Sequence, residues 1–84
     1  MINNIIKIFD KTKSLGIEIK QAWLRENILV TETIPKMIFK LDNVDSQLAS
    51  LQLILSEAKI ESKELEIIDL RFDKPVIKFA PEKK

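Results

Sequence analysis

The 84-residue sequence predicts a single α+β domain in the order α-βββ-α-ββ, with two helices packed on an antiparallel sheet. Two observations predict this class. Apolar residues recur at helical spacing in two segments, whereas elsewhere they alternate with polar residues as strands do. Apolar residues make up 45% of the chain and charged residues 32%, a balance typical of globular domains rather than disordered chains.

The first helix is predicted over residues 1–16. Gly16 is the only glycine in the chain, and it stands where a helix commonly ends in a left-handed residue. One stripe at helical spacing is expected to face the core. Its members are Ile2, Ile5, Ile6 and Phe9.

A three-strand meander is predicted over residues 17–42. Alternating runs at 17–25 and 28–34 flank Glu26-Asn27, which we expect to form a two-residue hairpin loop. This register places Trp23 opposite Val30, and the alternation indicates that Trp23 lies in the core. The alternative for this single tryptophan is contact with a partner.

The third strand of the meander is predicted at residues 37–41, after the break at Pro35-Lys36. A tight turn there pairs Ile34 with Met37 and Val30 with Leu41.

The second helix is predicted over residues 44–59, because a segment rich in capping residues precedes it. Leu53 lies off its apolar stripe and is expected at the margin of the core. The stripe itself comprises Val44, Leu48, Leu51, Leu55 and Ala58, with Ile54 beside it.

A C-terminal hairpin is predicted over residues 65–80, followed by a frayed tail at 81–84. With Asp73-Lys74 as the loop, the apolar and charged faces separate. The expected pairs are Leu70 with Ile77, Ile68 with Phe79, and Asp69 with Lys78.

The last strand of this hairpin is expected to be an open edge of the sheet. Unpaired N–H and C=O groups on an edge can accept a strand from another chain. The expected contacts of such a partner include the strand residues themselves, which are Val76, Ile77, Lys78 and Phe79.

The composition disfavours most kinds of chemistry. Cysteine and histidine are absent, and the single glycine precludes a glycine-rich phosphate loop. Because the acidic residues are spread beside lysines, we expect no catalytic residues, no cofactor and no metal site. A net charge of +1 without basic clustering argues against a nucleic-acid binder. The expectation is a non-enzymatic protein.

The segment Ile68-Asp69-Leu70-Arg71-Phe72-Asp73, followed by a strand ending in Phe79-Ala80-Pro81, resembles the C-terminal signature of the FtsQ/DivIB family of bacterial cell-division proteins. The resemblance implies the membrane-distal β domain of that family. Its members are scaffolds of the division complex, or divisome, that act in septum formation outside the cytoplasm and have no enzymatic activity.

The resemblance also implies a partner and its contacts. The β domain of the family takes a strand from the bitopic protein FtsB, which is itself paired with FtsL. The implied contacts are Arg71, Phe72 and Phe79, and more weakly Arg25. Where relatives use Tyr or Trp, phenylalanine at 72 and 79 keeps only the apolar part of the contact.

Family members carry a cytoplasmic tail, a transmembrane helix and a POTRA domain before this region. No such segment is visible in the sequence, which also shows no signal peptide. The resemblance therefore implies either an excised soluble domain, whose parent protein lies on the extracytoplasmic face of the cell membrane, or an unusually short relative. The alternative is a stand-alone cytoplasmic protein-interaction domain unrelated to cell division.

Overall fold

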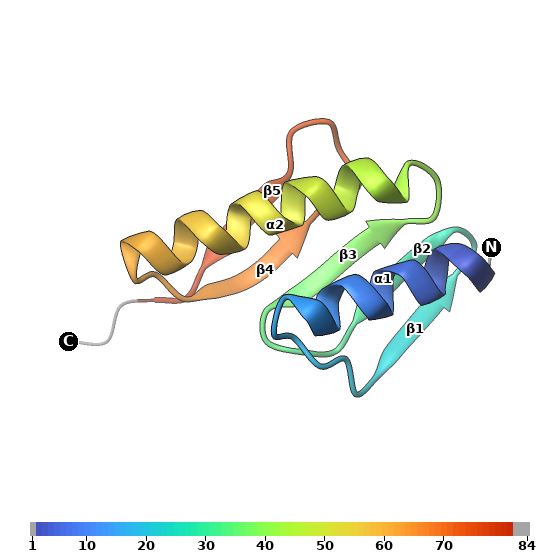
Figure 1. Cartoon of the computed structure of the whole chain (residues 1–84), viewed down its shortest axis with the longest axis horizontal. Coiled ribbons are helices and arrows are strands. Elements are labelled where there is room, and N and C mark those ends of the chain that lie inside the picture. The colour runs from blue at the N-terminus through green and yellow to red at the C-terminus, as the bar shows by residue number, and fades with distance from the viewer. Residues whose placement is uncertain (1, 82–84) are drawn as a thin grey trace.

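The computed structural model describes residues 2–81, and its elements follow the predicted α-βββ-α-ββ order (Figure 1). Met1 and residues 82–84, most of the predicted tail, lie outside the described residues. The elements are α1 (Ile2–Ser14), β1 (Ala22–Arg25), β2 (Ile28–Thr31), β3 (Lys36–Lys40), α2 (Val44–Glu61), β4 (Leu65–Asp69) and β5 (Val76–Phe79).

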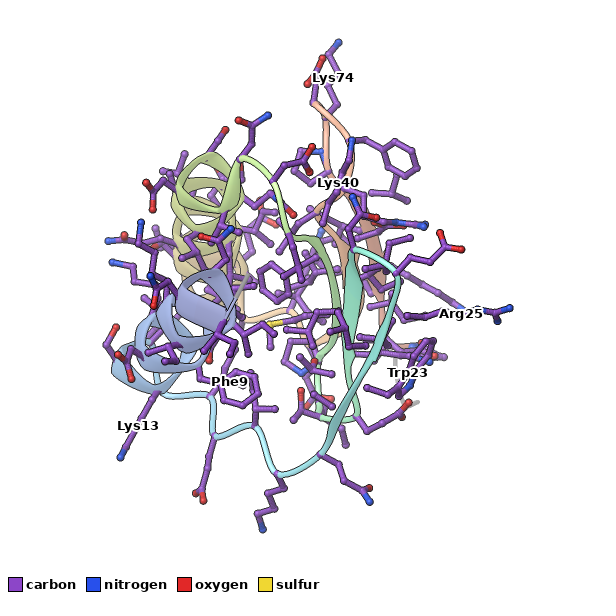
Figure 2. All side chains as sticks on the ribbon, turned by 90° about the vertical axis from the view of Figure 1, so that its right-hand side faces the viewer. Phe9, Lys13, Trp23, Arg25, Lys40 and Lys74 are labelled. Carbon is purple, nitrogen blue, oxygen red and sulfur yellow. The ribbon has the colours of Figure 1, made fainter. Side chains whose placement is uncertain are left out.

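The five strands form one open sheet in the order β1-β2-β3-β4-β5. β3 and β4 are parallel and the other neighbours antiparallel, so the sheet is mixed and the predicted purely antiparallel sheet is wrong. The parallel pair requires a crossover, which α2 supplies. Both helices cover the same face, α1 on the β1–β2 side and α2 beyond it (Figures 1 and 2).

The core lies between this helix layer and the sheet. Its fully buried side chains include Met37 and Phe39 from β3, Ile68 from β4, Ile8 from α1 and Leu51 from α2. The opposite face of the sheet carries no helix (Figure 2).

The predicted core stripe of α1 is wrong at three of its four positions. Ile5 is partly buried against the core, but Ile2 is 73% exposed, and Ile6 and Phe9 are also exposed. The buried positions are instead Ile8 and Thr12. The helix has apolar residues over a wide arc, so tertiary contacts decide which part is buried. These contacts include the Asn4 Nδ2 group, which donates to the Leu41 carbonyl at 2.7 Å. The helix ends as predicted, with Gly16 at a φ of 89°.

The β1–β2 register is confirmed, with Trp23 opposite Val30 across the loop Glu26-Asn27. β1 begins at Ala22, so it is shorter than the predicted strand, which began at residue 17. Trp23 is 47% exposed, so its assignment to the core is wrong. It lies on the face of the sheet that the helices leave uncovered.

The predicted β2–β3 register is wrong. Val30 pairs with Ile38 instead of Leu41, and this shift by an odd number of positions reverses the face. Ile34, predicted opposite Met37, lies in the loop and is 91% exposed. The observed register is held by the Met37 N–H, which donates to Thr31 Oγ1 at 3.0 Å in a buried position.

The apolar stripe predicted for α2 is confirmed. Val44, Leu48, Leu51 and Ala58 are buried, with Ile54 and Leu55 partly buried against the same core, and Leu53 is 65% exposed. The helix start is fixed by Gln47, which sequence reasoning missed. Its side chain accepts from the Lys40 N–H at 2.8 Å and donates to the Lys40 carbonyl at 2.7 Å, joining α2 to the end of β3.

Candidate functional site

β5 is an edge strand of the sheet, as predicted. Among residues 2–81 its only strand neighbour is β4, and all four of its residues are exposed. The Ala80 N–H donates at 2.9 Å to the carbonyl of Glu64, the residue just before β4. Because backbone groups alternate in direction along an antiparallel strand, the N–H groups of Lys78 and Val76 face β4, while those of Ile77 and Phe79 point outward.

The register of the last hairpin differs from the prediction by an even number of positions. Ile68 pairs with Ile77 and Asp69 with Val76, so the apolar and polar faces are kept although the individual pairs change. The pairing is irregular between Leu65 and Ile67, a β-bulge at Glu66. The predicted opposition of Asp69 and Lys78 is wrong.

Arg71 is instead paired with Asp69 of its own chain segment. Its Nε donates to Asp69 Oδ1 at 2.9 Å and its Nη2 to Oδ2 at 2.7 Å, a bidentate geometry. The side-chain hydrogen bonds from Arg71 hold the pKa of the Asp69 carboxyl below its ordinary value, against the raising effect of burial. The same hydrogen bonds raise the pKa of Arg71.

This pair changes how Arg71 can be used as a probe. At a solvated, unpaired arginine, charge reversal to glutamate would weaken partner binding with little effect on stability. In the structure the change would set a second carboxylate beside Asp69, whose side chain is only 13% exposed. Arg71→Glu is therefore expected to lower stability as well as affinity.

Aromatic side chains flank the edge on both ends of β5. Phe72 is 54% exposed, and its ring centroid lies 5.3 Å from the Arg71 guanidinium carbon. Phe79 is 43% exposed with the Lys63 ammonium 5.2 Å from its ring centroid. Both rings are thus available as apolar anchors beside cationic groups.

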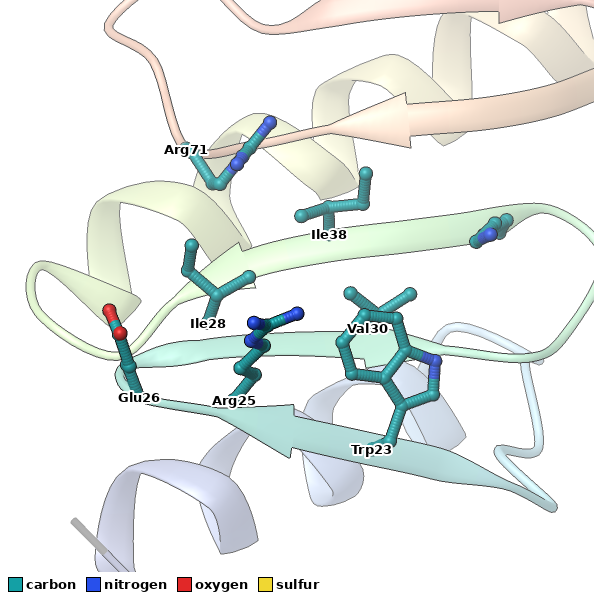
Figure 3. A pocket seen from close by; sticks show the side chains of 8 residues that line it. Trp23, Arg25, Glu26, Ile28, Val30, Ile38 and Arg71 are labelled. Carbon is teal, nitrogen blue, oxygen red and sulfur yellow. The ribbon is translucent and has the colours of Figure 1, made fainter.

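A groove of about 570 Å³ lies on the helix-free face of the sheet (Figure 3). Its floor is apolar and is formed by Ile28, Val30 and Ile38, with the Trp23 ring beside them. These side chains come from the three N-terminal strands and point away from the helices. The alternation of β2 and β3 indicated two distinct faces, but the predicted register placed Val30 on the face toward the helices.

The rim of this groove is mainly cationic. Arg25, Lys36 and Arg71 line it together with one acidic residue, Glu26. Arg25 extends from the end of β1 and Arg71 from the end of β4, on either side of the apolar floor (Figure 3). The structure therefore brings two of the predicted contact residues, distant in sequence, to one groove, and adds Lys36, which the sequence did not single out.

The predicted contacts form two neighbouring surfaces. The β5 edge holds Val76, Ile77, Lys78 and Phe79, whereas Arg25 belongs to the groove alone. Arg71, next to Phe72, lines the groove. It lies two residues after the end of β4, the strand that pairs with β5. Within residues 2–81, no three acidic side chains come together in an arrangement suited to a metal ion.

No model of a known protein family matches the chain, and no curated protein matches it. Among residues 2–81, no helix has both the length and the apolar character needed to cross a lipid bilayer.

Proposed function

We propose that this chain is a non-enzymatic protein-binding domain that accepts a partner strand at the edge of β5. The observation that carries the proposal is the free edge itself, where Ile77 and Phe79 direct backbone N–H groups outward. Main-chain hydrogen bonds give such complexes affinity, and pockets for alternate side chains give specificity.

The surroundings of the edge define the chemistry of the partner. An added strand presents apolar side chains to Ile77 and Phe79, which share the helix-side face with Ile68. On the other face it meets Lys78, which forms only a 3.8 Å ion pair with Glu66 at the surface. An extended segment with an apolar, acidic alternation therefore fits best.

The groove extends this surface across the sheet. A partner chain that continues from the β5 edge past Arg71 reaches the apolar floor and Arg25. Acidic side chains in that continuation would meet a rim with three cationic groups, of which Arg71 is already paired with Asp69, and one acidic group. The edge supplies pairing and the groove supplies selection by charge.

The biological setting of the proposal rests on the resemblance to FtsQ/DivIB proteins. In that setting the domain is a divisome scaffold on the extracytoplasmic face of the membrane, and the partner is an FtsB-like bitopic protein paired with an FtsL-like one. A cytoplasmic interaction domain unrelated to division would use the same edge with a different partner. The identity of the bound peptide separates these two settings.

The test is calorimetric titration with the membrane-proximal segment of the FtsB-like protein. Ile77→Pro removes an outward N–H and is expected to weaken binding at least about tenfold. Ile77→Ala removes the side chain but keeps the donor, so it serves as the matched control and retains most of the affinity. The N–H of Lys78 faces β4, so Lys78→Pro is expected to destabilise the hairpin itself.

Charge reversal is tested at Arg25, which is exposed and belongs to no short-range ion pair in residues 2–81. Arg25→Glu is expected to weaken binding by about 1–2 kcal/mol at low salt, with little change in melting temperature. Equal affinities for the parent, Ile77→Pro and Arg25→Glu would show that neither surface binds the segment. No binding by the parent protein would remove the division setting.

A further inference from the structure

The opposite edge of the sheet is formed by β1. In the part of the chain that the structure describes, β1 pairs only with β2, and the Glu32 N–H donates to the Gln21 carbonyl at 2.8 Å. Alternation along the strand then directs the backbone groups of Trp23 toward β2 and those of Ala22 and Leu24 outward. This edge has free donors and acceptors at two positions.

An exposed apolar stripe on α1 accompanies this edge. Ile2, Ile6 and Phe9 recur at helical spacing and are 73%, 51% and 39% exposed. The side of α1 that turns toward α2 is marked by Lys7, which pairs with Asp45 at 3.4 Å. The stripe lies on another side of the helix, and Phe9 points toward the segment that leads into β1 (Figure 2).

We propose that β1 pairs with β1 of a second copy of this chain, in antiparallel orientation about a two-fold axis, forming a continuous ten-strand sheet. The strand is self-complementary in this arrangement. With Trp23 opposite its own copy, Ala22 pairs with Leu24 of the second copy and Leu24 with its Ala22. Arg25 then lies opposite Gln21, so no like charges face each other.

The helices fit the same arrangement. A two-fold axis perpendicular to the sheet keeps both helix layers on one face. Since α1 lies over the β1–β2 side of the sheet, the two-fold axis beside β1 brings the two copies of α1 next to each other (Figure 1). Ile2, Ile6 and Phe9 of each copy would then face each other across the axis.

The area indicates a weak dimer. The half-exposed apolar side chains at this edge offer on the order of 500 Å² per copy, less than the roughly 800 Å² per partner of standard interfaces. They are Ile2, Ile6, Phe9, Trp23 and Leu24. An interface below the standard size is commonly weak and transient, so a dimer populated only at high protein concentration is expected.

β5 is less suited to pairing with its own copy. The antiparallel register that uses both outward residues sets Ile77 opposite Phe79 and thereby Lys78 opposite Lys78, a like-charge pair. Lysine on an edge strand commonly discourages such contacts. The two edges thus differ: β1 matches itself, whereas β5 needs a partner with different charges.

Sedimentation of the full chain between about 10 µM and about 1 mM tests the proposal. The expected result is a monomer at the low end and mostly dimer at the high end. Because Trp23 is the only tryptophan, its emission should shift to shorter wavelength over the same range as its ring becomes covered. A monomer throughout, with constant emission, overturns the proposal.

Two variants locate the interface. Ala22→Pro removes an outward N–H from β1, and Ile6→Lys places a charge in the α1 stripe without touching the strand. Each is expected to raise the dissociation constant at least about tenfold. Ile60→Lys is the matched control, since Ile60 is 82% exposed near the end of α2 and should leave association unchanged.

Self-association through β1 is independent of the proposed function, because β1 and β5 lie at opposite edges of the sheet. Ile77→Pro should leave the dimer intact, while Ala22→Pro should leave binding of the partner segment intact. A dimer that is lost in Ile77→Pro but persists in Ala22→Pro and Ile6→Lys would place self-association at β5 and refute the β1 interface.

Discussion

Replacing Arg71 with methionine tests whether the Asp69–Arg71 pair stabilises the hairpin that carries the β5 edge. The change removes the two side-chain donors, which lie 2.7 and 2.9 Å from the Asp69 carboxylate, and leaves the backbone N–H at 3.2 Å. Breaking a fully buried pair costs about 3–5 kcal/mol, and an exposed pair contributes at most about 1 kcal/mol. With side-chain exposures of 13% for Asp69 and 34% for Arg71, we expect a loss of about 2 kcal/mol.

The loss should depend on pH in a defined direction. The pKa of Asp69 is lowered from its ordinary value of 3.8, so the pair's contribution is fully present above that value and is lost as pH falls through the lower, folded-state pKa. The parent protein and Arg71→Met should therefore differ in neutral urea melts and converge in acid, once the pH has fallen below the lowered pKa of Asp69.

A double-mutant cycle with Asp69→Asn isolates the interaction. The coupling free energy is expected to be about 1–2 kcal/mol at neutral pH. At this chain length the loss in Arg71→Met corresponds to a fall in melting temperature of about 10 °C. A coupling below about 0.5 kcal/mol, or a difference that persists unchanged into acid, would refute the assignment of this pair to hairpin stability.

Two further predictions concern the core and the end of α1. Phe39→Ala, at a fully buried position, should cost about 3–5 kcal/mol in urea melts, whereas Trp23→Ala, at a half-exposed one, should cost about 1–2. Equal losses would contradict the assignment of Trp23 to the uncovered face. Gly16→Ala should cost about 1 kcal/mol from its φ of 89° alone, since no atom lies within 4 Å of an added Cβ. Gly16→Asn should be tolerated better, and a neutral Gly16→Ala would argue against the left-handed end of α1.

Element order and type followed from local signals, but strand register did so in only one place. The loop Glu26-Asn27 fixes the β1–β2 pairing through a local turn, and that prediction was confirmed. β2 and β3 have apolar residues on both faces, as Leu29 beside Val30 and Ile38 beside Phe39 show, so alternation was compatible with more than one register. The buried Thr31–Met37 hydrogen bond that supports the observed one is a tertiary feature.

The candidate site could be predicted only in part for the same reason. The edge position of β5 follows from its place at the end of the chain's strand order, and the exposed Phe72 and Phe79 agree with it. The groove could not be predicted, because it depends on which face Val30 occupies. Nor could the parallel β3–β4 pair, since pairing between distant strands is set by how α2 packs.

The attachment of β5 to a single strand neighbour within residues 2–81 couples its stability to anything that binds beside it. A strand with one neighbour and four exposed residues opens locally at a lower free energy than the interior of the sheet, and its amide protons exchange with solvent through those openings. A strand that bound only the closed form of β5 would make these openings rarer, by the linkage between binding and folding. Binding would slow hydrogen exchange at the inward amide of Lys78 together with the outward amide of Ile77, because each strand closes the other.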